Sequence, residues 1–437
     1  MRFRPKFGSS LKWLIPGMGV KRWLLLLFAG ITIVSLGVGY VLVDIYRTWT
    51  LPAIFYYLTL QFIPRAVRGL LFGTAGIAAI IIAVLQLNRS LLSAFRSPGQ
   101  SSLVDIIYNH RQRSRGPKVV AIGGGTGLSA LLRGLKEHTE NITAVVTVAD
   151  DGGSSGRLRR DLGLPPPGDF RNCIAALADD ESLTARLFQY RFGQGMGLNG
   201  HSFGNLFIAA MAEVTGNFEH ALLESSRVLN IRGRIVPSTL ENVTLWADLR
   251  EDDGEVQRPS QVQGESQISK TGRPIERVFL EPDKIPAYPG AIKAILEADL
   301  ITAGPGSLYT SVLPNLLVPG IASALRASPA TKVYICNIAT EEGETDHFSL
   351  DDHLQALEEH VGQDMFTYVL ANDNLKVQFP RHVNVEVVSP QTLRSESYQL
   401  VAADLVDLEN PWQHHPKKLA EQLMDLYWSV RAKTATG

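Results

Sequence analysis

The sequence predicts an α/β fold of Rossmann-like type, with a mostly parallel open sheet, a small antiparallel β insertion and two transmembrane helices before it. The first observation is the segment KVVAIGGGTGLSALLRGL (118–135), in which an apolar run breaks into glycines and resumes at helical spacing. The second is that this rhythm of strand, turn and helix recurs along the chain, as in right-handed parallel units. The third is a pair of long uncharged segments near the amino terminus.

Residues 1–96 are predicted to form a membrane anchor. The segments 23–43 and 69–87 carry no charge over a length that spans a bilayer as a helix. The second segment also has the glycine and alanine content of packed membrane helices. A cleaved signal peptide is the alternative for the first segment, but its apolar run is too long and a second span follows it.

Basic residues predict the orientation of this anchor. Six of them precede the first span and six follow the second, up to Lys118, whereas three lie between the spans. By the positive-inside rule we expect both termini and the globular part to face the cytoplasm, at the inner membrane. Residues 97–116, rich in Ser, Pro, Gly and basic side chains, are interpreted as a tether.

The α/β domain is predicted over residues 117–410. The hydrophobic period changes towards two at about 233–282, which indicates an antiparallel β insertion. Residues 365–373 and 383–390 are expected to be late strands, and residues 411–437 to hold a C-terminal helix. The net charge of −1 gives no reason to expect a nucleic-acid partner. The two cysteines lack metal-ligand spacing and are interpreted as core thiols of a reducing compartment.

Three glycine-bearing turns follow predicted strands, at 123–127, 152–156 and 304–310. The carboxyl edge of an open α/β sheet is where ligands bind, so the three turns are expected to present free N–H groups to one crevice. The first turn fits neither common phosphate motif, because position 128 is leucine and the first lysine after the turn is Lys136. A plain tight turn is the alternative for each taken alone.

Charged residues accompany the second turn. Asp150 and Asp151 end the strand, where an acid can accept from a ribose hydroxyl, and Arg157 can pair with phosphate. For Arg159 and Arg160 we favour a solvated helix face.

Asp169 begins a helix after three prolines and is interpreted either as its N-cap or as a ligand group. Asp150, Asp151 and Asp169 could share a Mg²⁺ bound to phosphate oxygens, although no cofactor is required by the sequence.

Further polar residues stand beside glycines. His201, with Asn205 one turn on, is either structural or part of the site, and the adjacent Ser202 does not form a hydrolase pair with it. Ser307 can cap a helix. Tyr309 could stack on a base or sugar, or pack in the core. Asn337, Thr340 and Glu344 follow the next strand and could line the same cleft.

An ordered set of motifs resembles one known family. AIGGGTGLSALLRGLK, VTVADDGGSSGRLR, PPPGDFRN, GHSFGNLFIAAM and GPGSLYTSVLPNLLVPGI are similar to the gluconeogenesis factor (YvcK-like) family, over residues 117–390. That family is related to the CofD 2-phospho-L-lactate transferases, which move a phospholactyl group using Mg²⁺. The resemblance implies a Rossmann-like fold, cytoplasmic exposure, binding of a UDP-sugar such as UDP-N-acetylglucosamine, and regulation of cell shape and envelope growth according to carbon source. The two amino-terminal spans depart from the usual soluble member.

The predicted ligand-binding residues combine the turn chemistry with the matched motifs. They are Gly124, Gly125, Thr126, Gly127, Asp150, Asp151, Gly152, Gly153, Ser154, Ser155, Arg157, Asp169, Asn172, His201, Asn205, Gly306, Ser307 and Tyr309.

Three functional hypotheses follow from the sequence. The first is a membrane-tethered nucleotide-sugar-binding regulator, with envelope-synthesis proteins as partners and a homo-oligomeric state. The second is a Mg-dependent transferase of the 2-phospho-L-lactate type. The third is a scaffold that binds no small ligand. No general base is paired with a nucleophile in the sequence, so no catalytic residue is predicted and binding is favoured.

Overall fold

The computed structural model describes residues 20–49, 52, 54–93, 112–178, 183–194, 197–250, 260–380, 383–392 and 397–434. The chain divides into two compact units, Met1–Gln112 and Arg113–Gly437, and each is described by itself. Most of the predicted tether, residues 97–111, lies outside the described residues.

The amino-terminal unit contains the two expected apolar helices. Its helices are α1 (Val20–Thr48), α2 (Ile54–Leu58) and α3 (Arg65–Ser93). The windows Phe28–Ile45 and Arg65–Ala83 are long and apolar enough to cross a membrane, and none of their residues is buried inside the protein. The predicted spans 23–43 and 69–87 fall within α1 and α3.

A parallel sheet forms the centre of the second unit. Within the described residues it has seven strands in the order β10-β9-β8-β7-β1-β2-β3, and every neighbouring pair is parallel. The strands are β1 (Val119–Gly123), β2 (Ile142–Val146), β3 (Arg234–Pro237), β7 (Leu300–Ala303), β8 (Thr331–Ile335), β9 (Tyr368–Asn372) and β10 (Gln399–Ala403). The predicted Rossmann-like, mostly parallel sheet is therefore confirmed.

The strand order reverses between β1 and β7. From β1 the chain passes outward through β2 and β3, then returns to place β7 on the other side of β1, with Val120 opposite Ile301. The chain consequently continues from β1 to β2 and from β7 to β8 in opposite directions along the sheet. In open α/β sheets a reversal of this kind is the place where a crevice opens at the carboxyl edge.

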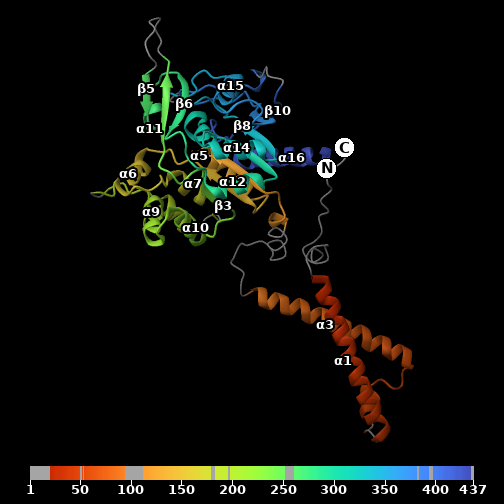
Figure 1. Ribbon diagram of the computed structural model, residues 1–437. Helices are drawn as coiled ribbons and strands as arrows, with labels where there is room; N and C mark the ends of the chain where they lie inside the picture. Colours follow the sequence, from red (N-terminus) through yellow and green to blue (C-terminus); the bar gives the residue numbers. More distant parts are fainter. Residues whose placement is uncertain are drawn as a thin grey trace. The chain divides into compact units, whose positions relative to one another are not determined.

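Helices cover the sheet, as Figure 1 shows. They are α5 (Gly125–Leu135), α6 (Gly153–Leu162), α7 (Gly168–Leu177), α8 (Leu183–Gln189), α9 (Phe203–Thr215), α10 (Phe218–Val228), α12 (Pro289–Leu296), a π-helix (Leu308–Val312), α13 (Leu313–Leu316), α14 (Pro319–Ala327), α15 (Leu350–Val361), a 3₁₀ turn (Pro390–Thr392) and α16 (Pro416–Thr434). All residues of β1 and β7 are buried. This explains why those strands read as continuous apolar runs, since a parallel sheet is covered on both faces.

The antiparallel insertion is confirmed, with a later start than predicted. Its strands β4 (Thr244–Leu249), β5 (Ser260–Gln263) and β6 (Ile275–Glu281) form a separate sheet in the order β5-β4-β6, beside α11 (Glu265–Ile268) (Figure 1). The prediction that the insertion begins at about 233 is wrong. β3 pairs in parallel with β2 and is the edge of the main sheet, so the insertion begins after it.

Residues 383–390 also differ from the prediction, because they do not form a strand of the sheet. Their backbone bonds instead to the loop after β8. Val388 N–H donates to Ile338 O at 2.9 Å, and Glu386 N–H donates to Thr340 Oγ1 at 2.9 Å. Alternating side chains fit a strand of the sheet and also an extended segment that bonds to a loop, so the pattern alone could not distinguish the two. Among the described residues the last strand is β10.

The last helix, α16, packs closely against α5, the helix that follows the first glycine turn. A Cβ placed on Gly134 of α5 would lie 2.0 Å from Pro416 O, the first residue of α16. No side chain fits there. The backbone of α16 can therefore approach α5 directly, and this fixes the segment that precedes α16.

We expect Gly134→Ala to destabilise the protein, although a change from glycine to alanine usually stabilises a helix. Alanine normally stabilises a helix interior by about 1 kcal/mol relative to glycine. Here the added methyl meets a backbone oxygen, so we expect the free energy of unfolding to fall by about 1 to 3 kcal/mol. Urea unfolding of the full chain in detergent measures this. Gly193→Ala, where a Cβ has open space, is the control, and an unchanged or raised stability of Gly134→Ala would contradict this packing.

Candidate functional site

A pocket of about 260 Å³ lies at the carboxyl ends of β1, β7 and β8, beside the reversal of strand order. Four segments supply most of its walls: the glycine turn after β1, the loop after β7, the loop after β8 and a stretch just before α16. The lining residues are 124–127, Ala130, 305–307, Ser311, Asn337, 339–342, Val385 and 412–414. The first and third predicted turns are thus brought together in one pocket.

Glycine residues, which have no side chain, allow these loops to pack closely. A Cβ on Gly127 would lie 2.6 Å from Pro305 O, and a Cβ on Gly124 would lie 2.5 Å from Asp169 Oδ2. Gly125 has a φ of +63°, which glycine adopts without strain. The glycines after β1 are therefore explained first by contact with neighbouring protein backbone and carboxylate.

The amino end of α5 provides hydrogen-bond donors to the pocket. Gly125 N–H is taken by the carboxylate of Asp169. Gly124, the N-cap, makes no side-chain cap, so the next amides, of Thr126 and Gly127, have no partner within the helix. The positive end of the helix dipole adds to these N–H groups, which makes this end of the pocket suited to an anion.

The loop after β7 is fixed by an amide side chain. Gly306 N–H donates to Asn337 Oδ1 at 3.0 Å, and Asn337 Nδ2 donates to Gly306 O at 3.1 Å. This exchange uses the Gly306 amide that the sequence offered to a ligand. Asn337 and Thr340, expected to line the cleft, do line the pocket.

The opposite part of the pocket carries acceptors. Ser307 Oγ donates to Glu341 Oε1 at 2.6 Å, while Glu341 Oε2 is buried and has no partner among the described residues. Burial raises the pKa of Glu341 above its usual range. Glu341, which the sequence did not single out, therefore lines the pocket beside the glycine turns, with one carboxyl oxygen bonded to Ser307 and the other enclosed by protein.

The second predicted turn does not line this pocket. Asp150 accepts from Gly152 N–H at 2.8 Å, and Asp151 Oδ1 accepts from Ser266 N–H of α11 at 2.8 Å. Gly152 and Gly153 lie at the start of α6. This turn is instead connected to the pocket through Asp169, whose pKa responds to the charge of Asp150.

Arg159 has a structural role that differs from the solvated face expected for it. Its Nε donates to Asn242 Oδ1 at 2.9 Å, and Nη2 donates to the backbone oxygen of Val243. Together with the Asp151–Ser266 contact, this ties the second turn to the antiparallel insertion. Charge spacing alone could not show this contact, because Asn242 lies 83 residues away in the sequence.

A buried polar network holds the residues between α6 and α9. Ser154 Oγ lies 3.0 Å from His201 Nδ1, and Asn205 Nδ2 donates to Ser154 Oγ at 3.1 Å and to Ser155 Oγ at 3.5 Å. Burial lowers the pKa of His201, so its neutral ring can accept from the Ser154 hydroxyl. Arg157 Nη2 donates to Asn199 O at 2.9 Å. These predicted site residues are gathered together, but they are not among the residues that line the pocket.

Two further predicted residues also lie away from the pocket lining. Tyr309 is buried, and its ring packs edge-on against Phe348 and His360. Asn172 accepts a hydrogen bond from Arg171 Nη2 at 2.8 Å. The core alternative for Tyr309 matches this position.

Carboxyl groups cluster behind the glycine turns. Burial, followed by the charge of Asp150, raises the pKa of Asp169 to about 6 and that of Glu265 well above its usual range. Burial and Glu341 raise the pKa of Glu344 to about 8. Glu344 accepts from Ser269 and Thr310, so it links the insertion to the loop after β7.

A magnesium ion would find two of the three predicted carboxylates near one another. Asp150 and Asp169 interact, whereas Asp151 is turned to α11. No group of three His, Cys, Asp or Glu residues that could hold a metal ion occurs in the part of the chain that the structure describes. A Mg²⁺ ion bound here would therefore need ligand oxygens or water in addition to protein carboxylates.

Two parts of the site have only a weak signal in the sequence. Residues 412–414 precede a helix that the sequence assigned to a separate segment, and Glu265 lies in the insertion. For residues 412–414, the signal available in the sequence was the polar run Gln413–His415 immediately before Pro416, at the start of a helix.

An open parallel sheet with a polar pocket and two glycine turns at its switch point defines a Rossmann-like α/β protein. Residues 119–406 match the family described as 2-phospho-L-lactate transferase CofD. The chain belongs to the CofD family and, within it, to the YvcK-like group that includes the gluconeogenesis factors.

Relatives of known name share most of their length with this chain. It is 48% identical over 317 residues to "Gluconeogenesis factor" of Bacillus subtilis, covering 71% of this chain and 98% of that protein. A relative from a Nostoc species is 42% identical over 427 residues, covering 95% of this chain and 92% of its own length. A crystal structure of a Bacillus halodurans protein is 44% identical, with a TM-score of 0.65 over 71% of this chain and 99% of that one.

Asp169→Asn should stabilise the protein at neutral pH. The pKa of Asp169 is raised from 3.8 to about 6 in the folded chain, so the folded state binds more protons than the unfolded state between these values. The stability that this group contributes is present below pH 3.8 and is lost as pH rises through about 6. We expect the variant to be more stable by about 1 to 2 kcal/mol at about pH 7.5, because asparagine keeps an acceptor for Gly125 N–H without the buried charge.

Thermal unfolding of both proteins from about pH 4 to about pH 8 measures this difference. It should grow between pH 4 and pH 6 and then stay constant, while the exposed Asp283→Asn serves as control. A difference that is constant across the whole range would show that Asp169 does not titrate with a raised pKa.

Proposed function

We propose that this protein is a nucleotide-sugar-binding regulator whose ligand is of the UDP-N-acetylglucosamine type. The observation that carries the proposal is the polarity of the pocket at the switch point. Helix amides of Thr126 and Gly127 stand at one part of it, and the acidic residues Glu341 and Glu342 line another. A ligand with a phosphate at one end and hydroxyl groups at the other satisfies both.

The phosphate would be held mainly by backbone. Neither lysine nor arginine occurs among the residues that line the pocket. Amide donors at a helix start bind phosphate without a cationic side chain. Asp150 and Asp169 could add a Mg²⁺ ion, which would neutralise charge between these carboxylates and the phosphate oxygens.

The family supports a regulatory role. A relative at 48% identity is named gluconeogenesis factor, and the motif resemblance connects that group with cell shape and envelope growth on gluconeogenic carbon sources. We extend this role to the present chain, with envelope-synthesis proteins as its partners and a homo-oligomer as its working state.

Transferase activity of the 2-phospho-L-lactate type is the alternative. The match to the CofD family and the adjacent Asp150 and Asp169 favour it. In the described part of the site, His201 pairs with Ser154 away from the pocket lining, and the Ser307 hydroxyl in the pocket has the carboxylate of Glu341, not a histidine or lysine, as its hydrogen-bond partner. Binding without turnover is therefore preferred.

Calorimetric titration of the full chain in detergent with UDP-N-acetylglucosamine tests the binding. Glu341→Gln keeps an acceptor for Ser307 but removes the carboxylate and replaces its second oxygen with an amide donor. We expect its affinity for the nucleotide sugar to fall about tenfold, while its affinity for inorganic diphosphate does not fall. Glu276→Gln, on an exposed position of β6, is the control.

Chromatography of the ligand after incubation, with and without Mg²⁺, separates the hypotheses. Recovery of intact ligand supports the regulator, and a consumed ligand, or a consumed phospholactyl nucleotide, supports the transferase. A chain that binds neither nucleotide sugar nor diphosphate would contradict both proposals and favour a scaffold.

The membrane location is tested separately by protease treatment of cells. We propose that α1 and α3 cross the inner membrane with both termini inside, because basic residues flank their outer ends. In intact spheroplasts the domain 117–437 should be protected, and it should become cleavable after lysis. Cleavage before lysis, or recovery of the full chain in the soluble fraction, would overturn this topology.

A further inference from the structure

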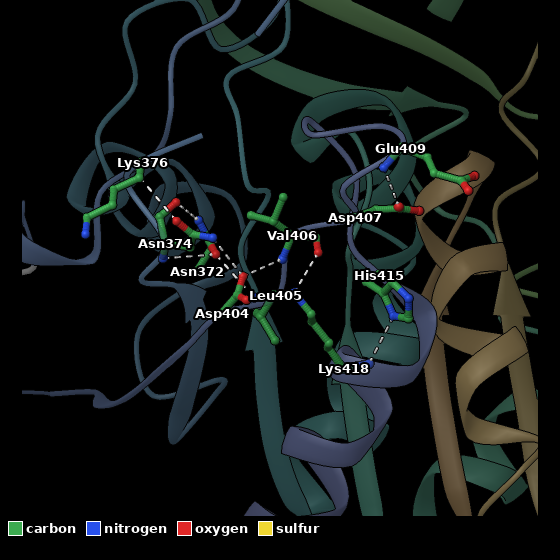
Figure 2. Close-up of polar contacts among 10 residues, drawn as sticks. All are labelled: Asn372, Asn374, Lys376, Asp404, Leu405, Val406, Asp407, Glu409, His415 and Lys418. Atoms are coloured by element: carbon green, nitrogen blue, oxygen red, sulfur yellow. Dashed lines mark hydrogen bonds and ion pairs between the residues drawn. The ribbon is translucent and has the colours of Figure 1, made fainter. Parts of the chain in front are cut away.

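The stretch after β10 folds back on itself before α16 begins. Lys418 Nζ pairs with Asp404 Oδ2 at 2.7 Å and donates to Val406 O at 3.1 Å (Figure 2). Leu405 N–H donates to Asn372 Oδ1, at the end of β9, at 3.2 Å. These contacts tie the ends of β9 and β10 to the first turn of α16, so both ends of the intervening loop are held.

That loop, residues 404–415, is a hairpin. Val406 and His414 form an antiparallel bridge, and Asp407 N–H donates to Gln413 O at 3.0 Å. The hairpin brings residues 412–414 to the pocket wall, although they lie beyond residue 406, where the CofD family match ends. Part of the wall therefore comes from outside the matched segment.

The hairpin places a large aromatic side chain at the pocket. Among the described residues that line the pocket, Trp412 is the only tryptophan, tyrosine or phenylalanine, and it is partly exposed. Within the described part of the chain, Trp412 belongs neither to the hydrophobic core nor to the side chains packed against it. Its indole also has no ring contact and no hydrogen bond with any described residue. An indole that the core does not use, on a pocket wall, is available to a ligand.

We propose that Trp412 is a specificity-determining residue, whose indole face is the platform on which the sugar ring of the ligand stacks. This inference rests on the proposed function. A sugar ring has an apolar face of C–H groups, with its hydroxyl groups at the edge. The negative face of an aromatic ring attracts such C–H groups, and stacking removes the apolar surface of both rings from water.

An accessible carboxylate of the same pocket selects a sugar rather than a base for this platform. Glu342 lines the pocket, is exposed, and has no hydrogen bond or ion pair with any residue that the structure describes. Its oxygens can accept from sugar hydroxyl groups, whereas they repel the carbonyl oxygens of a uracil ring. The sugar therefore lies towards Trp412 and Glu342, and the phosphate lies towards the amides of Thr126 and Gly127.

Two substitutions separate stacking from simple apolar contact. Trp412→Phe keeps a flat aromatic face, whereas Trp412→Leu keeps an apolar side chain without one. We expect Trp412→Leu to weaken binding of UDP-N-acetylglucosamine about three- to tenfold, and Trp412→Phe to stay within about twofold of the unmodified chain. The Tm of both variants should be unchanged, because this side chain is not packed against the core.

UDP, which lacks the terminal sugar, is the matched probe, and its affinity should not change in Trp412→Leu. Trp428→Leu, at a half-exposed position of α16 outside the pocket lining, is the control. Equal losses for UDP and UDP-N-acetylglucosamine in Trp412→Leu would place the base on the indole and overturn the assignment, as would full retention of both. All titrations use the full chain in a detergent without a sugar headgroup, because such a headgroup would compete for the platform.

Fluorine NMR of the full chain labelled with fluorotryptophan tests the platform without a nucleotide. The chain has six tryptophans, and the signal that is absent from Trp412→Phe belongs to Trp412. Free N-acetylglucosamine should shift this signal and leave that of Trp428 in place. If the unmodified chain binds neither UDP-N-acetylglucosamine nor UDP, the proposed function fails, and the Trp412 signal then decides the assignment: a shift supports it and no shift overturns it.

Discussion

The close packing of Gly127 against Pro305 O is the contact on which the site depends. It brings the turn after β1 against the loop after β7, at the place where the strand order reverses. A side chain of any size at this position would separate the two loops. The same contact aligns the amino end of α5 with the loop that carries Ser307, and Ser307 in turn fixes Glu341. Donors and acceptors of the pocket are therefore set by backbone approach.

Electrostatics behind the pocket oppose folding, because several carboxyl groups are buried near one another. Asp169 and Glu344 have raised pKa values because burial penalises their charged forms, and a tenfold change in a proton dissociation constant corresponds to about 1.4 kcal/mol. Groups with strongly perturbed pKa values cluster at functional sites of proteins in general. The insertion contributes to this group through Glu265 and through the Asp151–Ser266 contact. The second turn therefore couples the insertion to the pocket without lining it.

Local sequence patterns predicted the helices, strands and turns better than they predicted which residues interact with one another. The apolar runs of β1 and β7 and the glycines that follow them indicated a parallel sheet with a crevice. Residues 383–390 alternate like a strand, yet they bond to the loop after β8. Arg159 looked like an exposed helix residue, yet it binds Asn242. In both cases the local sequence allows two arrangements, and contacts with residues distant in the chain select one.

The sequence by itself determined the fold class, the apolar helices and the glycine turns, because hydrophobic period and glycine freedom act over a few residues. The tertiary structure alone decided which polar groups face one another. Nothing in the sequence connects Trp412 with the glycine turns, or Glu341 with Ser307, because this arrangement requires the hairpin after β10 and the order of the central strands. The donors of the pocket are local to one helix end, whereas its acceptors are assembled from segments distant in the chain.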